Sequence, residues 1–311
     1  MSNSLTKTDR KQLVRQSSSN AVTDFFRKVS FIMPAMVLLV LLTGYPLFQV
    51  IQMSFYDYTD KSNPVYNGMA NYRAFLEDPL FWNALKNTLT FTFVSVACGL
   101  ILGLTLALLL NQPIHSKLRG ALRSLFMFPW LTSSTVVAAV WMLILNPFGL
   151  LNWILQSLGF QELGQTAWLS NEHTAIFGVI LANIWRGFPF MMLMLLAGLQ
   201  TIPKDLYEAA DLDGAGFFRR LFYVTLPQLK SILLTVTVLE IIWNFRSFDL
   251  VFLMTGGGPM NATEILSTYI YQHAFRTLDF GYASATAIFM LLVMILVSIA
   301  YLRTSLGKES N

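Results

Sequence analysis

The chain has 311 residues, of which 55% are hydrophobic and only 12% charged, with a formal net charge of +4 and a mean hydropathy of +0.55. This composition excludes an ordinary water-soluble domain, in which about 25% of residues are charged. The single cysteine, Cys98, excludes a disulfide framework and a thiolate metal site. The three histidines lie in different loops without the spacing of metal ligands, so a metal site has no support.

Hydrophobic residues gather in blocks long enough to cross a bilayer. No Asp, Glu, Lys or Arg occurs in residues 29–56, 87–116, 124–161 or 280–302, and each stretch exceeds the roughly 20 residues that a transmembrane helix needs. Two further blocks contain charges but have a similar length and polar flanks, so we count them as spans. The sequence therefore predicts an all-α integral membrane protein with six transmembrane helices, at about 30–53, 88–110, 125–145, 174–198, 231–255 and 281–302.

Lysine and arginine are distributed unevenly between the two sides of this predicted bundle. The tails 1–28 and 303–311 and the loops 111–123 and 200–230 hold 15 of them, whereas the three alternate loops hold 4. Cytoplasmic segments carry such an excess of cations, so we predict that both tails lie in the cytoplasm and flank a transmembrane domain at 29–302. Topology thus accounts for the net charge, and no nucleic-acid partner is inferred. The first span is too long for a cleaved signal peptide and is interpreted as a retained anchor.

Two local patterns indicate close packing and a membrane interface. Gly99 and Gly103 form a GxxxG pattern in the second span, which is typical of close contact between helices. After the third span, Pro147 and Gly149 interrupt an apolar run that resumes through Trp153. We interpret that segment as a short helix in the outer membrane interface, with Trp153 at the level of the lipid headgroups.

The last long cytoplasmic loop has the punctuation of two short helices. Pro203 suits a first helical turn, Asp205 and Glu208 favour the positive end of the helix dipole, and Gly214 can close the helix in the left-handed conformation. A second helix is predicted to end at Pro227.

The first of these helices has a low face, formed by Ala209 and Ala210 beside Glu208. Such a face can enter a groove on a partner protein more closely than a face of larger side chains. From the residues alone, an ordinary capped connector remains an equal alternative to a docking helix.

The same loop closely resembles the EAA motif of binding-protein-dependent permeases. The match consists of Glu208-Ala209-Ala210, three residues, Gly214, nine residues, and Val224-Thr225-Leu226-Pro227, with Val224 where Ile is usual. In that family the EAA helix sits in a cleft of a separate ATPase subunit and transmits its closure to the membrane helices. The resemblance implies a type I ABC importer permease fold, and it implies coupling to the ATPase through Glu208, Ala209, Ala210, Asp211, Leu212, Asp213 and Gly214.

Further segments resemble the carbohydrate subfamily related to the maltose-transporter permease. They are Phe81-Trp82 with Asn87-Thr88, Trp185 through Pro189, Thr255-Gly256-Gly257-Gly258-Pro259 and Asp279-Phe280-Gly281. The resemblance implies a multi-pass permease of the bacterial inner membrane that imports a sugar or oligosaccharide by alternating access. Its implied partners are a second homologous permease subunit, two ATPase subunits and a soluble extracytoplasmic solute-binding protein.

The resemblance also implies that this chain is not an enzyme and has no catalytic residue, metal site or cofactor of its own. ATP and Mg²⁺ would bind to the partner ATPase. In agreement, the sequence contains no GxxxxGK[ST] phosphate-binding loop.

Four charged residues lie inside predicted spans, where a charge is costly unless it is paired or wet; they are Arg186, Glu240, Arg246 and Asp249. Arg246 and Asp249 are three residues apart, and we predict that they pair with each other. Glu240, Asn244 and Ser247 are spaced i, i+4, i+7 and form one polar stripe. We expect the stripe to line the transport pathway; interhelical hydrogen bonds that lock the bundle are the alternative.

The resemblance to the maltose-type permease leads to the same face. In that permease the sugar lies between the third, fourth and fifth spans, and the matching positions here are Trp130, Ser134, Asn183, Arg186, Gly187, Phe190, Glu240, Asn244 and Ser247. Trp130 and Phe190 would stack on a sugar, although both rings could equally be core. Arg186 and Glu240 depart from the neutral maltose-type pattern. By this hypothesis Arg186 either grips an anionic group, such as a uronate carboxylate, or neutralises Glu240.

An ion-coupled secondary transporter subunit is the alternative function, with Glu240 as its proton carrier. The absence of inverted-repeat halves and the presence of the EAA loop count against it. A membrane enzyme would need a nucleophile and base, or a metal cluster, near one face, and the sequence shows neither.

Overall fold

The computed structural model describes residues 29–30, 32–58, 60 and 63–306, so the predicted tail 1–28 and residues 307–311 of the predicted C-terminal tail lie outside the described residues. The chain divides into two units, residues 1–53 and 54–311. In the first unit, a helix at Ile32–Met53 is long and apolar enough to span a membrane. It contains one π-helical turn, η1 (Val40–Gly44), and continues as α2 (Tyr45–Met53).

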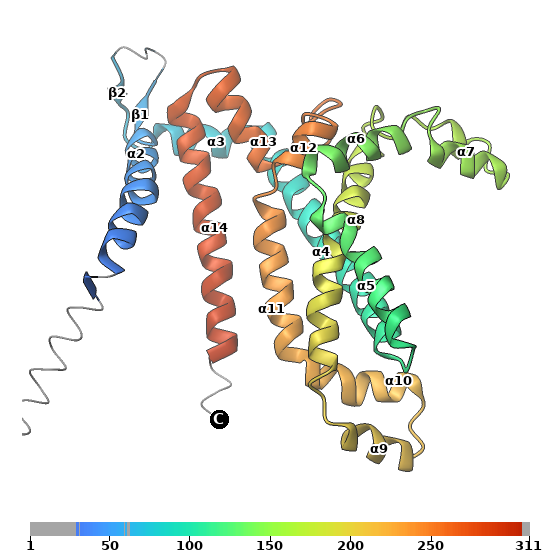
Figure 1. Cartoon of the computed structure of the whole chain (residues 1–311). Helices are drawn as coiled ribbons and strands as arrows, with labels where there is room; N and C mark the ends of the chain where they lie inside the picture. Colours follow the sequence, from blue (N-terminus) through green and yellow to red (C-terminus); the bar gives the residue numbers. More distant parts are fainter. Residues whose placement is uncertain (1–28, 31, 59, 61–62, 307–311) are drawn as a thin grey trace, which may run out of the picture. The chain divides into compact units, whose positions relative to one another are not determined.

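The second unit contains the other candidate spans (Figure 1). Three of them correspond to predicted spans, namely α4 (Pro79–Asn111), α8 (Ala175–Leu199) and α14 (Phe280–Leu306). The ends of α8 and α14 shift by at most four residues, whereas α4 begins at Pro79 and not at residue 88. A fourth is the helix Phe217–Phe245, and a fifth is a bent pair of helices. Counting that pair as one span, the described residues contain the six membrane-spanning elements that the sequence predicted.

The third predicted span, 125–145, is wrong in its start and its shape. The structure has α5 (Ser116–Leu131) and α6 (Ser134–Ile144), which are bent by 96° at a short break. Pro129 lies inside α5, where it lacks the N–H that the helix ladder needs. The side chain of Ser133 then accepts a hydrogen bond from the N–H of Val136 at 3.4 Å and caps α6. A proline followed by an N-cap residue therefore divides the apolar run.

The fifth predicted span, 231–255, is also divided. It consists of α11 (Leu226–Phe245) and the short α12 (Asp249–Met254), with a break between them. A side chain from another segment contacts the break: the Ser267 hydroxyl donates a hydrogen bond to the backbone carbonyl of Ser247. Hydropathy alone does not reveal the break, because apolar residues continue on both sides of it.

Pro227 does not end the second helix of the cytoplasmic loop as predicted. That helix, α10 (Phe217–Arg220), passes through a π-helical turn, η3 (Leu221–Thr225), into α11, which makes Phe217–Phe245 one continuous helix. Pro227 cannot donate to the carbonyl four residues earlier and its ring crowds that carbonyl. The wider turn, in which the N–H of Leu226 donates to the carbonyl of Leu221, accommodates the proline.

The short elements confirm one further expectation. A helix follows the Pro147 and Gly149 interruption, as predicted, in α7 (Leu150–Ser157). The Gly256-Gly257 run forms a turn with positive φ angles. The remaining elements are β1 (Tyr56–Asp57) paired antiparallel with β2 (Val65–Tyr66), α3 (Ala70–Glu77), η2 (Leu163–Gln165), α9 (Lys204–Leu212), α13 (Leu266–Tyr271) and η4 (Gln272–Arg276).

A polar junction fixes the start of α4 to α13 and α14. The Asp78 carboxylate caps α4 by accepting a hydrogen bond from the N–H of Leu80 at 2.8 Å. It also accepts hydrogen bonds from the hydroxyls of Tyr269 at 2.5 Å and Tyr282 at 3.1 Å. Burial alone raises the pKa of Asp78, but these hydrogen bonds and the nearby His273 hold its pKa below the usual value. The junction therefore favours a charged carboxylate that anchors three helices.

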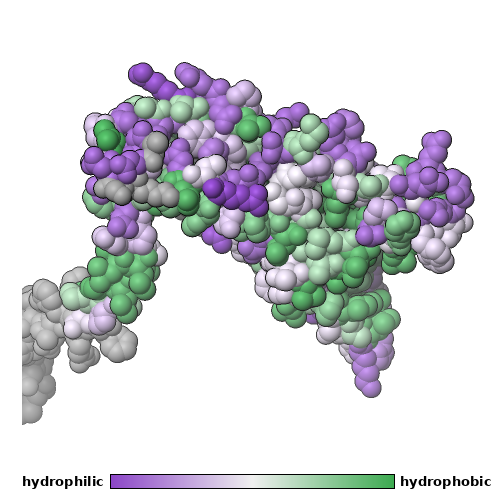
Figure 2. Space-filling view, turned by 90° about the horizontal axis from the view of Figure 1, so that it is seen from above, coloured by the Kyte–Doolittle hydropathy of each residue, from purple (hydrophilic) through white to green (hydrophobic). Residues whose placement is uncertain are grey.

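The core of the second unit lies where α4 packs against α8, and glycines permit the close approach. A Cβ atom added to Gly103 would lie 2.9 Å from the Cβ of Met191 and 3.0 Å from the backbone nitrogen of Met192. The GxxxG prediction of close packing is thus confirmed. Figure 2 shows hydrophilic residues gathered over the end from which the molecule is viewed and hydrophobic residues along the helices that run away from it. Large apolar side chains exposed on these helices include Phe93, Ile101, Leu109, Leu292 and Leu296.

The two glycines of this contact should differ in their tolerance of alanine. At Gly103 the new methyl group would meet backbone, whereas at Gly99 it would meet the mobile end of Met191, the Cε at 2.8 Å and the Sδ at 2.9 Å. We predict that Gly103→Ala destabilises the protein by about 1–3 kcal/mol through overpacking, while Gly99→Ala stays close to wild type. Thermal unfolding of the purified protein measures both, and equal melting temperatures for the two variants would contradict the packing described.

Candidate functional site

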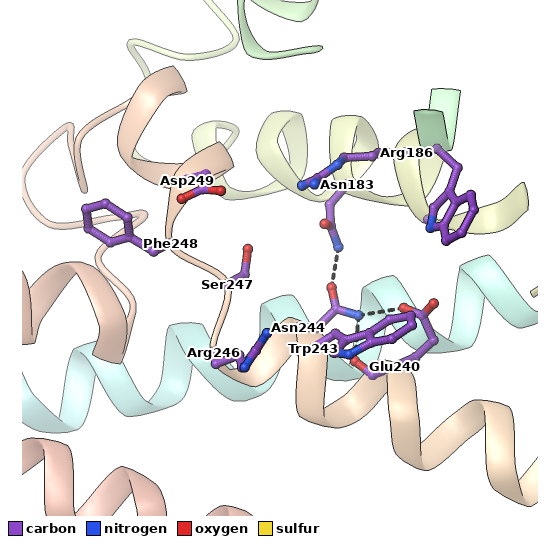
Figure 3. Close-up of a pocket in the computed structure, with 11 residues that line it drawn as sticks. Asn183, Arg186, Glu240, Trp243, Asn244, Arg246, Ser247, Phe248 and Asp249 are labelled. Atoms are coloured by element: carbon purple, nitrogen blue, oxygen red, sulfur yellow. Dashed lines mark hydrogen bonds between the residues drawn. The ribbon is translucent and has the colours of Figure 1, made fainter. Parts of the chain in front are cut away.

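A cavity of about 610 Å³ lies at the level where α11 breaks, between α5, α8, α11 and the start of α12 (Figure 3). Polar, charged and aromatic side chains line it together. The lining residues are Trp130, Asn183, Arg186, Gly187, Glu240, Trp243, Asn244, Arg246, Ser247, Phe248 and Asp249. A cavity of this size, with a few polar groups among aromatic rings, has the character of a small-molecule site.

A chain of hydrogen bonds crosses from α8 to α11 at the cavity wall. The Nδ2 of Asn183 donates to the Oδ1 of Asn244 at 2.5 Å. The Nδ2 of Asn244 donates in turn to the backbone carbonyl of Glu240 at 2.8 Å and to its Oε2 at 3.1 Å (Figure 3). Asn244 and Glu240 are each only 5% exposed. The polar stripe predicted on the fifth span therefore lines the cavity, and its Asn244 also joins two helices; that the stripe lines a transport pathway stays a prediction.

The four charges inside the predicted spans all line this cavity, and they include two cations and two anions. Arg246 and Asp249 do not form the ion pair that their spacing predicted: among the described residues, no ion pair within 4.0 Å involves either of them. The spacing argument assumed one continuous helix, whereas the break places Arg246 at the end of α11 and Asp249 at the start of α12. Asp249 instead accepts a hydrogen bond from Ser134 of α6 at 3.4 Å.

Aromatic rings form one wall of the cavity. The Trp130 and Phe190 rings are stacked with centroids 6.0 Å apart, and Phe190 lies 4.9 Å from the ring of Trp243. Trp130 and Trp243 line the cavity, whereas Phe190 supports them from behind. Sequence reasoning missed Trp243, although its position three residues after Glu240 and four before Ser247 is a helical spacing that would have found it.

The structure brings the predicted substrate-binding residues together. Seven of the nine line the cavity, namely Trp130, Asn183, Arg186, Gly187, Glu240, Asn244 and Ser247. The other two, Ser134 and Phe190, each contact a lining residue, Asp249 and the tryptophan rings respectively. Their role in binding a substrate stays a prediction. Within the described residues, no group of three or more His, Cys, Asp or Glu side chains is placed to hold a metal ion.

The predicted coupling residues lie on and just after α9, and the helix divides them between two faces. One face of α9, called the outer face here, carries three exposed residues at spacing i, i+1, i+4, namely Glu208, Ala209 and Leu212. Leu212 is 91% exposed, so the expected low face carries one large apolar side chain as well as the glutamate. Their contact with an ATPase stays a prediction.

The opposite face of α9 is turned toward the chain itself. Tyr207 and Ala210 are half-buried there, and Asp211 forms an ion pair with Arg220 of α10, with its Oδ1 2.6 Å from the arginine Nη1. Gly214 has a φ of +69°, a left-handed conformation that favours glycine. Of the predicted coupling residues, Ala210, Asp211 and Gly214 thus shape the loop itself.

Comparison with known proteins gives a family and several relatives. Residues 99–304 match the family described as "Binding-protein-dependent transport system inner membrane component". The chain is 36% identical over 308 residues to the sulfoquinovosyl glycerol transport system permease protein SmoG of Agrobacterium fabrum, covering 98% of both chains. It is 40% identical over 237 residues to the trehalose/maltose transport system permease protein MalF of Thermococcus litoralis, covering 76% of this chain and 78% of the relative.

The fold also matches a solved structure. A chain from the crystal structure of a bacterial ABC transporter involved in import of the acidic polysaccharide alginate superposes with a TM-score of 0.80, at 22% identity, covering 93% of this chain and 98% of that one. This likeness confirms the predicted importer permease fold.

The hydrogen-bond chain at the cavity wall should depend on Asn244. Asn244→Leu would leave the Asn183 amide and the Glu240 carboxylate without their partner, and an orphaned buried polar group costs about 1–3 kcal/mol. We therefore predict a lower melting temperature for Asn244→Leu. Ser247→Ala is the matched control, because the Ser247 hydroxyl lines the cavity and makes no hydrogen bond to another described residue. Equal stability of the two variants would show that the chain of hydrogen bonds is not structurally important.

Proposed function

Since the chain belongs to the family of inner membrane components of binding-protein-dependent transport systems, we propose that it is the membrane-spanning permease subunit of an ATP-binding-cassette importer for a sugar or oligosaccharide. One observation carries the proposal. The continuous helix Phe217–Phe245 begins in the cytoplasmic loop that holds the EAA motif and ends beside the cavity, where it contributes Glu240 and Asn244. Movement applied to the loop can therefore reach the cavity lining directly.

The chemistry of the cavity supports a sugar as cargo. Rings of Trp130 and Trp243 offer flat apolar surfaces to a sugar ring, while Asn183, Asn244 and Ser247 offer amide and hydroxyl groups to its hydroxyls. Relatives with sugar cargo in their names, SmoG and MalF, lie at 36% and 40% identity.

An anionic sugar is favoured by the arginines. Arg186 and Arg246 line the cavity, and neither forms an ion pair with another described residue within 4.0 Å. A carboxylate or sulfonate on the cargo can supply a charge-assisted, bidentate partner to such a guanidinium. The names of two similar proteins mention acidic cargo, sulfoquinovosyl glycerol and alginate. We propose that Arg186 binds the acidic group and that Glu240, held by Asn244, keeps the empty cavity near neutrality.

The proposed assembly follows the family. This subunit pairs with a second homologous permease, two ATPase subunits bind ATP and Mg²⁺ at the cytoplasmic face, and a soluble binding protein delivers the sugar from outside. The cation distribution supports a cytoplasmic location of both termini and of the EAA loop. ATP-driven closure of the ATPases would move α9 and open the cavity outward to receive the sugar. ATP hydrolysis itself takes place on the ATPase subunits.

The energy source separates this proposal from an ion-coupled secondary transporter. Uptake into membrane vesicles that contain the whole assembly should persist when an uncoupler dissipates the proton gradient, and it should stop when ATP is withheld. The opposite pattern would favour the secondary transporter with Glu240 as proton carrier. The match to a binding-protein-dependent family favours the ATP-driven reading.

Replacement of Arg186 should separate acidic from neutral sugars. We predict that Arg186→Leu lowers uptake of an acidic sugar at least about tenfold, because a charge-assisted hydrogen bond contributes about 1.5–3 kcal/mol, while Arg186→Lys retains part of it. Uptake of sulfoquinovosyl glycerol, an alginate oligosaccharide and maltotriose by the reconstituted assembly measures the effect. Unchanged uptake of every sugar by Arg186→Leu would rule out the proposed contact.

The outer face of α9 should hold the ATPase. Reversing the exposed charge with Glu208→Lys places a cation where the cleft accepts an anion, and like-charge or unpaired contacts at an interface cost several kcal/mol. We predict that the ATPase no longer copurifies with this variant. Glu172→Lys is the matched control, because Glu172 is an exposed acid just before α8, at the other end of that helix from the EAA loop. Normal copurification of the ATPase with Glu208→Lys would contradict the assignment.

A further inference from the structure

The EAA helix α9 is joined to the transmembrane helix α11 by a compliant piece of backbone. The connection between α9 and α10 contains Gly214, with a φ of +69°, and Gly216. Cβ atoms added to either glycine would meet nothing within 4 Å, so side chains do not pack around these two positions, and backbone hydrogen bonds from Gly214 and Ala215 to the end of α9 hold the turn. Glycine has the greatest backbone freedom of any residue. Left to the backbone alone, a force on α9 would bend the turn before it moved α11.

The packing beneath α9 is incomplete and does not by itself keep the glycine turn from bending. A second cavity, of about 160 Å³, lies under this loop. Residues of α9, α10 and η3 line it, including Tyr207, Phe217, Arg220 and Thr225, opposite the ends of α4 and α8. Tyr207 packs against the apolar cluster that contains Leu199 and Leu229, but the cavity leaves the rest of α9 without such support, so polar side-chain contacts also set its position.

Two side-chain contacts bridge the turn. The hydroxyl of Tyr207 lies 3.1 Å from the hydroxyl of Thr225, which is 3% exposed and donates to the backbone carbonyl of Arg220 at 3.3 Å. On the same face of α9, Asp211 pairs with Arg220. Both contacts run from α9 to residues of the continuous helix Phe217–Phe245, and neither involves a third element. Figure 1 shows α9 and α10 side by side below α11.

We propose that Tyr207–Thr225 and Asp211–Arg220 form a brace that makes α9 and the helix Phe217–Phe245 one rigid lever. The brace delivers movement of α9 to Glu240, about 22 Å further along the helix from Thr225 at 1.5 Å per residue. These four residues are positioning residues, and Asp211 acts on its own chain rather than on the ATPase. This inference rests on the proposed function. It adds that the brace keeps the glycine turn from bending when α9 moves.

The brace is suited to mechanical rather than folding stability. The Asp211 and Arg220 side chains are 55% and 35% exposed, and ion pairs at such exposure contribute little to the free energy of folding. The hydroxyl of Tyr207 can be removed while its ring keeps its place against Leu199 and Leu229. A variant without the brace should therefore fold and still reveal the loss of stiffness.

The test compares a variant without the brace, Tyr207→Phe with Arg220→Gln, with a matched control, Tyr223→Phe with Arg219→Gln. The control removes the same groups from the same segment, where Tyr223 is 79% exposed and, among the described residues, neither Tyr223 nor Arg219 makes a side-chain hydrogen bond or ion pair. Spin labels at Lys204→Cys on α9 and Ser231→Cys on α11, in a Cys98→Ser background, report the distance between the two helices in the assembled transporter.

With the brace intact, in wild type and control, the label distance distribution should stay narrow with and without ATP and vanadate. Without it, the distribution should at least double in width, or shift, when ATP and vanadate are added. The exchanged pair, Asp211→Arg with Arg220→Asp, should restore the narrow distribution that Asp211→Arg alone loses. A distribution in the variant without the brace that matches wild type in every condition would overturn the proposal.

A transport measurement completes the test. For any sugar of the panel above that the wild-type assembly imports, the number of sugar molecules moved per ATP hydrolysed should fall at least fivefold without the brace and stay unchanged in the control. An unchanged ratio would also overturn the proposal. If the wild type imported no sugar, the proposed sugar cargo would fail, whereas the spin-label distances, which need the assembly with its ATPase subunits, ATP and vanadate but no sugar, would still decide the brace.

Discussion

The arrangement depends on one helix that continues through a proline. Pro227 would ordinarily end a helix, but the π-helical turn Leu221–Thr225 supplies a wider backbone path that tolerates the missing N–H. Because of that turn, the end of the loop that holds the EAA motif and the cavity wall belong to one continuous element, Phe217–Phe245. A helix is stiff along its axis, so this continuity gives the loop a direct mechanical connection to Glu240 and Asn244.

A second constraint acts on the cavity, because charges inside a membrane must be compensated. Two arginines, one glutamate and one aspartate face the same space, and their formal charges sum to zero without a close ion pair among them. Asn244 satisfies Glu240 by hydrogen bonding, while the break after α11 lets Arg246 and Asp249 point to the cavity from the ends of two helices. Because the two arginines form no close ion pair, their guanidinium groups remain available to a ligand. The empty cavity in turn lacks the stabilisation that a close ion pair would give.

Sequence reasoning reached the parts that are encoded locally. Charge-free blocks located the spans because lipid tolerates few charges, and a spacing of i, i+4, i+7 placed Glu240, Asn244 and Ser247 on one face. It missed the bend between α5 and α6, the break after Phe245 and the continuity through Pro227, because each is decided by caps and tertiary contacts rather than by hydropathy. The wrong prediction of an Arg246–Asp249 pair followed directly from the missed break. For Phe190 the sequence left both a stacking ring and a core ring open, and the structure places it against the rings of Trp130 and Trp243.

We expect the EAA loop and the cavity wall to move together. Structures of the assembled transporter, determined with and without ATP and vanadate, test it most directly when the two states are superposed on the helix Phe217–Phe245. In both states α9 and the side chains of Glu240 and Asn244 should keep their mutual positions while the helix moves against α5. A helix that bends at Leu221–Thr225, with α9 displaced and the cavity wall unmoved, would contradict this expectation.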